Sequence, residues 1–218
     1  MKIKYLAHSC FLITSDAGTK IITDPYTTGG QTRFNYGEVG ESADLVTLSH
    51  GHGDHNNPGA VTGNPKILNE ATTAKVKDVT VKGVVAYHDD ANGAQKGKNI
   101  VFCFTVDGVN VCHLGDLGHQ LTDAQVAEIG KVDVLMVPVG GFFTIDAATA
   151  AQVCDKVKPK AVIPMHFKTA KAPTLPIADV EGFLVNKKNV TRVDGSEVEF
   201  KAGKLPASMQ IFALKPAR

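Results

Sequence analysis

Three histidines and a carboxylate occur within the six residues from His50 to His55, directly after an apolar run that ends at Leu48. Imidazole and carboxylate groups are the protein ligands of Zn²⁺ and its first-row neighbours. Two histidines separated by one residue, His50 and His52, can point the same way from an extended loop and share one ion. Asp54 and His55 follow at the turn, where they could bind a second ion a few ångströms from the first. Because one short loop cannot supply enough ligands for two ions, the fold must bring further ligands to this loop.

Candidates for these further ligands follow three later apolar runs. His88 follows the run Val84–Tyr87, Asp116 follows Val109–His113, and His166 follows a third run. Loops at one edge of a sheet would present such side chains to a common cleft. Each of these residues alone is weak evidence for a metal site. A lone histidine after a strand is more often structural, and an aspartate after glycine often forms a turn. Their recurrence favours a shared site.

Short apolar runs rich in β-branched residues alternate with turn signals through most of the chain. They predict strands over Ile3–Leu6, Phe11–Thr14, Lys20–Thr23, Leu45–Leu48, Val84–Tyr87, Ile100–Val106, Val109–His113, Val132–Val139, Ala161–Pro164, Val190–Val193, Glu197–Lys201 and Gln210–Leu214. Asp107 and Gly108 form a two-residue hairpin signal between two of these strands. Helices are predicted over Asp123–Ile129, capped by Thr122, and over Ala147–Lys158.

Strand-rich halves with interleaved helices indicate an α/β layered domain, in which sheets pack on each other and helices cover the outside. No linker, low-complexity stretch or repeat divides the chain. With 43% hydrophobic residues, the chain is long enough to bury a sizeable core. We therefore expect a single domain over residues 1–218.

The charge balance restricts the partners. Lys and Arg total 23 against 22 Asp and Glu, so no overall field would gather nucleic acid or an anionic membrane. No apolar run approaches the roughly 20 residues that cross a bilayer, and the start of the chain lacks a signal-peptide core. The expected protein is cytoplasmic and acts on a small molecule, with no nucleic acid or membrane partner. The four scattered cysteines, without a CxxC pair, are expected to be reduced.

The order of these segments resembles the metallo-β-lactamase-fold hydrolase superfamily along almost the whole chain. The residues HGHGDH at 50–55 are similar to its HxHxDH signature, and YHDD, HLGDLGH and IPMHF are similar to its later ligand segments. Within the superfamily the chain resembles small one-domain members, the group that includes ascorbate-6-phosphate lactonase. The resemblance implies an αββα four-layer sandwich with a metal site along one edge of the two sheets.

The resemblance also implies a ligand set for two divalent ions. One ion would be held by His50, His52 and His88. The other would be held by Asp54, His55 and His166, and Asp116 would bridge the pair. Zn²⁺ is the expected metal, and Mn²⁺ and Fe²⁺ also suit these ligands.

Four further residues near these segments have open roles. His113 and His119 are rival ligands, and His113 could replace His88 if the loop over 83–93 points away. We favour His88, because the superfamily places its third ligand before the Gly-Asp turn. His8 and Asp24 resemble segments near the metals, where they could orient ligands, face substrate or serve a structural role.

Such a site would activate water for hydrolysis, with Asp54 or Asp116 able to accept its proton. No GxSxG, Walker A or Rossmann motif offers another chemistry. A small ester, lactone or phosphodiester is the expected substrate, and a lactone leads because of the family resemblance. The alternative is a metal-binding or sensor protein without turnover. The natural substrate and the oligomeric state are not readable from the sequence.

Overall fold

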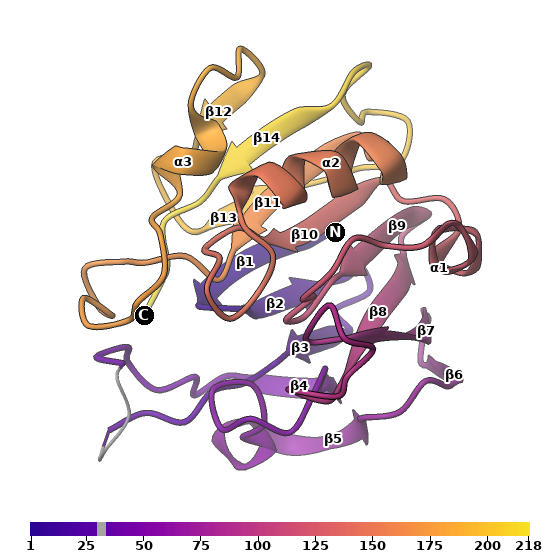
Figure 1. Cartoon of the computed structure of the whole chain (residues 1–218). Coiled ribbons are helices and arrows are strands. Elements are labelled where there is room, and N and C mark those ends of the chain that lie inside the picture. Colours follow the sequence, from indigo (N-terminus) through magenta and orange to yellow (C-terminus); the bar gives the residue numbers. More distant parts are fainter. Residues whose placement is uncertain (30–33) are drawn as a thin grey trace.

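A computed structural model describes residues 1–29 and 34–218, and in it two β-sheets pack face to face (Figure 1). The six-stranded sheet has the order β13 (Glu197–Glu199), β1 (Lys2–Ala7), β2 (Cys10–Thr14), β3 (Lys20–Thr23), β4 (Ser42–Thr47), β5 (Thr62–Leu68). The eight-stranded sheet has the order β12 (Val190–Arg192), β14 (Gln210–Ala213), β11 (Ala161–Met165), β10 (Val134–Pro138), β9 (Val109–His113), β8 (Lys98–Val106), β7 (Val79–Tyr87), β6 (Thr73–Val76).

The core between the sheets follows from the alternation of side chains along each strand. In β1 and β2, Tyr5 and Phe11 point into this core, where their rings stack 4.9 Å apart. From the other sheet, Phe102 and Phe104 belong to the same apolar cluster. Leu12 points the other way and belongs to a second cluster on the outer face of the six-stranded sheet. The central strands of the six-stranded sheet are therefore buried on both faces.

Helices cover the outer face of the eight-stranded sheet (Figure 1). Helix α1 (Asp123–Ile129) contacts β7 and begins with a capping box formed by Thr122 and Gln125. Helix α2 (Ala147–Val157) contacts β10 and α3 (Glu181–Leu184). Parallel connections through α1 and α2 join β9, β10 and β11.

The outer face of the six-stranded sheet is covered differently. In the described part of the chain, its only helical cover is the single turn η1 (Pro58–Ala60). Irregular segments supply the rest, with buried residues such as Tyr26, Tyr36, Leu175 and Ile177. The predicted α/β sandwich is confirmed. Its layer over the six-stranded sheet is mostly irregular chain, whose aromatic and aliphatic side chains cover the sheet without helical backbone.

The predicted strands and the two predicted helices are present, with ends shifted by a few residues. The hairpin at Asp107 and Gly108 is confirmed, and both residues have positive φ. Four elements of the described chain were not predicted: β5, β6, α3 and the single turn η1. Strand β5 contains Gly63 and Pro65, is mostly exposed and lies at a sheet edge, where proline is tolerated and apolar alternation is not needed.

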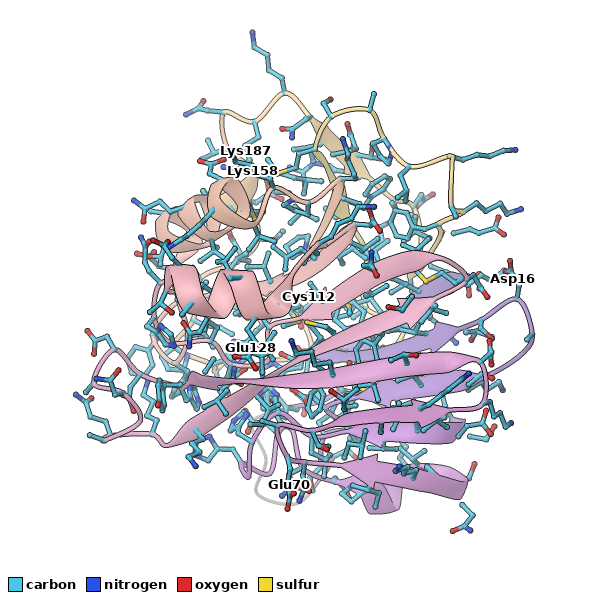
Figure 2. All side chains as sticks on the ribbon, turned by 90° about the vertical axis from the view of Figure 1, so that its right-hand side faces the viewer. Asp16, Glu70, Cys112, Glu128, Lys158 and Lys187 are labelled. Atoms are coloured by element: carbon cyan, nitrogen blue, oxygen red, sulfur yellow. The ribbon has the colours of Figure 1, made fainter. Side chains whose placement is uncertain are left out.

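All four cysteines are free, as predicted. Cys112 lies inside the molecule and Asp16 at its rim (Figure 2). No helix in the described residues is long and apolar enough to cross a membrane.

Candidate metal centre

Strands from both sheets end at one edge of the sandwich and carry the candidate ligands there. His8, Asp24 and His166 directly follow β1, β3 and β11, and all three have positive φ, at 57°, 41° and 52°. The loop after β4 holds the segment from His50 to His55. A left-handed residue after a strand turns the chain sharply, at some cost in strain for a residue with a side chain. The turn keeps each side chain close to the edge instead of carrying it away.

Asp116 lies at the centre of the cluster. Its Oδ1 is 3.2 Å from Nε2 of His55, and its Oδ2 is 3.3 Å from Nε2 of His166. The same Oδ2 lies 3.4 Å from Nε2 of His88 and 3.9 Å from Nε2 of His50. One carboxylate thus reaches histidines of both predicted ligand sets, which is the position a bridging ligand needs.

The structure brings all seven predicted ligands together. Three overlapping groups have donor atoms within 4.8 Å of one another: His50, His52 and His88; His50, His55 and Asp116; and His8, Asp54, His55 and His166. The first and third groups match the two predicted sets, and His8 joins the third. The predicted roles remain predictions, but the required proximity is present.

The rival histidines have other partners. Nε2 of His113 donates to the carbonyl of Ser9 at 2.8 Å, and its Nδ1 accepts from the amide of Gly115 at 3.2 Å. Nδ1 of His119 donates to the carbonyl of Gln120 at 2.7 Å, and its Nε2 accepts from a backbone amide. Because both ring nitrogens are occupied in each case, neither residue has a nitrogen free for a metal.

Asp24 holds the ligand loop without joining the donor groups. Its carboxylate accepts hydrogen bonds from the amide of Ser49 at 2.8 Å and from the Ser49 hydroxyl at 2.6 Å. It also accepts from Nδ1 of His55 at 2.9 Å. This last bond fixes the ring so that Nε2 faces Asp116, which is the usual way a carboxylate orients a metal-ligating histidine.

His8 lies beside the less buried carboxylate of the cluster. Its Nε2 is 3.3 Å from Oδ2 of Asp54, and its ring lies 4.1 Å from that of His166 and 4.8 Å from that of Phe34. Burial, followed by the charge of His166, lowers the pKa of His8 to about 4. The ring is therefore neutral near pH 7 and can donate one hydrogen bond to Asp54.

Two contacts that sequence reasoning missed hold the loop after β9. The buried side chain of Asn99 donates to the carbonyl of Leu114 at 2.8 Å and accepts from the amide of Asp116 at 2.9 Å. Gly118 lies so close to His88 that an added Cβ would be 2.2 Å from the His88 carbonyl carbon. Asn99 lies in an apolar strand without a distinguishing pattern, so no sequence signal marked it.

Burial and neighbouring charges set the protonation of the cluster. Burial, followed by the charge of His55, lowers the pKa of His50 to about 3. Burial also lowers the pKa of His88, where the charges of His52 and Lys96 act in the same direction and that of Asp116 opposes them. Although burial favours the protonated acid, His166 and His55 hold the pKa of Asp116 well below its usual range. The neutral imidazoles of His50 and His88 and the ionised carboxylate of Asp116 are the forms that bind metal. Although burial opposes it, Asp116 and Asp54 raise the pKa of His55, so this ring would release a proton when a metal binds.

The cluster also contains buried polar atoms that are unsatisfied within the described part of the chain. They are Nδ1 of His8, His88 and His166, Nε2 of His55 and Oδ1 of Asp116. The last two lie 3.2 Å apart, yet their orientation does not make a hydrogen bond. Since unsatisfied buried polar groups are costly, the donor set fits a divalent cation that would satisfy Nε2 of His55 and Oδ1 of Asp116 together.

A cleft of about 650 Å³ opens onto the cluster. His52, Gly53, Asp54, His88 and Asp116 form its polar side. Its other lining residues are Thr27, Phe34, Lys96, Phe143 and Leu175. A small molecule in this cleft would therefore touch the candidate ligands on one side and a mainly apolar wall on the other.

Comparisons with known proteins agree with this architecture. A family model described as a beta-lactamase superfamily domain matches residues 2–166. The chain is 34% identical over 196 residues to a UPF0173 metal-dependent hydrolase from Carboxydothermus hydrogenoformans, which covers 78% of this chain and 85% of that protein. A homologue of the same name from Archaeoglobus fulgidus is 30% identical over 198 residues and covers 78% of this chain and 84% of that protein.

A solved structure from Thermotoga maritima is similar along nearly the whole chain. It is 38% identical, covers 98% of this chain and 97% of that chain, and superposes with a TM-score of 0.79. That protein is described as a Zn-dependent hydrolase of the metallo-β-lactamase superfamily.

Proposed function

The chain belongs to the metallo-β-lactamase superfamily of metal-dependent hydrolases, and we propose that it hydrolyses a small ester, lactone or phosphodiester at a dinuclear site. The observation that carries the proposal is the position of Asp116, whose carboxylate lies within 3.9 Å of four histidine Nε2 atoms beside an open cleft. A site with two bound divalent ions supplies hydroxide near neutral pH and stabilises charge on the attacked group.

The ligands divide into two sets. His50, His52 and His88 would hold one ion, Asp54, His55 and His166 would hold the other, and Asp116 would contact both. Zn²⁺ is the proposed metal because imidazole and carboxylate suit it and because the similar Thermotoga maritima protein is described as Zn-dependent. Mn²⁺ and Fe²⁺ are the metals to compare with it.

Asp54 is the side chain best placed to accept a proton next to substrate. Its side chain is 33% exposed and borders the cleft, whereas Asp116 is almost fully buried. Burial favours the protonated form, but the charge of His55 and the hydrogen bond from His8 lower the pKa of Asp54. An ionised carboxylate with one oxygen held by His8 can take up a proton from a reacting group that it contacts.

A cyclic ester is the leading substrate. The cleft is the size of a small-molecule site, and its apolar residues Phe34, Phe143 and Leu175 exclude water from one side of a bound molecule. A lactone ring has an apolar body and a single reactive carbonyl, so it suits a cleft with one polar and one apolar side.

The proposal is tested by loading the protein with Zn²⁺, Mn²⁺ or Fe²⁺ and measuring turnover of lactones, phosphodiesters and thioesters. We expect hydrolysis of at least one lactone or phosphodiester, and a loss of at least a hundredfold in kcat for His50→Ala and Asp116→Ala. His119→Ala, which changes a histidine outside the cluster, should retain activity. Metal binding without turnover of any substrate would instead support a binding or sensor protein.

A further inference from the structure

We infer that the Lys96 ammonium binds an anionic group of the substrate, so that the cleft selects small molecules that carry a carboxylate or phosphate on an apolar body. The inference rests on the proposed function, since it assigns a substrate class to the same cleft. It starts from a residue that no sequence pattern marked.

The backbone around Lys96 is held tightly. The loop between β7 and β8 folds around Asp89, whose carboxylate accepts hydrogen bonds from four backbone amides. One of these is the amide of Lys96, at 2.6 Å. The amide of His88 donates to the carbonyl of Gly97 at 3.1 Å, which joins the loop to a candidate metal ligand. The backbone of Lys96 is therefore held in place beside the cleft.

Within residues 1–29 and 34–218, the Lys96 ammonium contacts neutral groups only. Its Nζ donates to the carbonyl of Phe143 at 2.8 Å and to that of Phe142 at 3.4 Å, and it lies 5.9 Å from the centre of the Phe143 ring. Among the described residues, no carboxylate forms an ion pair with it. A carbonyl solvates an ammonium without neutralising it, so the cation still favours an anion that reaches it.

The rest of the cleft explains why a substrate would supply that anion. The two carboxylates that line it, Asp54 and Asp116, are surrounded by the candidate metal-ligating histidines. Lys96 shares the remaining lining with Phe34, Phe143 and Leu175. Hydrogen bonds between an ammonium and an anion are about twice as strong as neutral ones, and apolar walls reduce competition from water. An acidic substrate thus gains an interaction that its neutral analogue lacks.

Binding is measured by calorimetry on the metal-loaded protein with phenylacetate, benzylphosphonate and the neutral phenylacetamide. The first two probes separate a carboxylate from a phosphate-like group. We expect the wild type to bind at least one anion about tenfold or more tightly than the amide, and Lys96→Met to lose most of that preference. Because metal ions also attract anions, the difference between wild type and Lys96→Met isolates the lysine.

Two variants control the experiment. Lys96→Arg keeps the charge and should keep the preference for anions. Lys82→Met removes another lysine whose Nζ donates to a backbone carbonyl, that of Glu128, outside the cleft, and it should change nothing. The inference would be overturned if Lys96→Met left the affinity for the anions unchanged. It would also be overturned, in favour of a structural role, if the variant lowered the affinity for phenylacetamide as much as that for the anions.

Kinetics separate this inference from the proposed function. Mono-p-nitrophenyl glutarate and p-nitrophenyl pentanoate share one scissile ester and differ in charge. Lys96→Met should raise KM for the anionic ester about tenfold, with little change in kcat, and leave the neutral ester within about twofold. If the wild type hydrolysed no ester, lactone or phosphodiester, the proposed function would fail, whereas calorimetry would still decide the role of Lys96.

Discussion

Asp24 shows how a residue outside a metal cluster controls the residues within it. Its carboxylate binds the amide and hydroxyl of Ser49 and Nδ1 of His55, and so fixes both the start of the ligand loop and one ligand ring. Burial works against ionisation, yet the hydrogen bond from His55 and the nearby histidine charges lower the pKa of Asp24. An ionised acceptor keeps the proton of His55 on Nδ1 and leaves Nε2 for a metal.

Asp24→Asn should therefore weaken metal binding while keeping the fold. The amide is nearly isosteric and can still bind Ser49, but it does not select the same tautomer of His55. We expect metal affinity to fall by about 10- to 100-fold, measured by competition with a chelator. Asp194→Asn removes an exposed carboxylate that pairs with Lys215, and it should leave affinity unchanged. Equal affinities in Asp24→Asn and wild type would contradict an orienting role.

The pKa of His8 predicts a pH dependence of stability in the metal-free protein. The folded pKa is about 4 and the ordinary value is 6.5, so the unfolded chain binds more protons between these values. The stability contribution of His8 is complete above pH 6.5 and decreases as the pH falls towards 4, by an amount on the order of 3 kcal/mol. The raised pKa of His55 acts in the opposite direction and is present in both proteins to be compared.

His8→Gln should accordingly flatten the pH dependence. Glutamine cannot take up a proton, so the decrease in unfolding free energy between pH 6.5 and 4.5 should be smaller than in wild type. Urea unfolding of the metal-free proteins at several pH values measures the difference. Parallel curves for the two proteins would contradict the prediction.

At the scale of elements, β8 and β9 position the central carboxylate. Asn99, at the start of β8, binds both sides of the turn after β9, at Leu114 and Asp116. At the other end of β9, Asn110 is bound instead by Asp133. The two asparagines thus anchor opposite ends of one strand, but only one end bears on the metal cluster.

Asn99→Ala should leave two buried backbone groups unsatisfied and lower stability by about 2–4 kcal/mol. Because the turn holds Asp116, metal content should fall as well, measured by elemental analysis of the purified protein. Asn110→Ala should lower stability and leave metal content unchanged. Loss of metal in both variants, or in neither, would contradict a specific role for the Asn99 contacts.

Most of the elements that the sequence predicted have strong apolar runs and form the centres of both sheets, whereas the short edge strands β12 and β13 were predicted without such a run. Strands β5 and β6 lie at sheet edges and carry mostly exposed or half-buried residues, so no alternation marked them. The ligand segments were predictable because each follows such a run. Asn99 and Lys96 were not, because their roles depend on contacts between loops that are distant in sequence or lack a characteristic spacing.

At the scale of the whole molecule, the two sheets meet at the edge where the ligands gather, and each sheet supplies part of the set. His8 and the segment from His50 to His55 come from the six-stranded sheet, whereas His88, Asp116 and His166 come from the eight-stranded sheet. The packing of Tyr5 and Phe11 against the opposite sheet therefore fixes the distance between the two halves of the site. The family resemblance anticipated this arrangement, whereas composition and periodicity indicated only a layered α/β domain.

The irregular layer over the six-stranded sheet links substrate choice to the stability of the fold. Phe34 and Leu175 belong to the apolar cluster that covers this sheet, and both also line the cleft. A substitution of either residue that adapts the cleft to a new substrate would also weaken the apolar packing that covers the six-stranded sheet. Divergence towards other substrates is thus easiest at Lys96, which lies outside both apolar clusters, and laboratory evolution of the wall would need compensating stabilisation elsewhere.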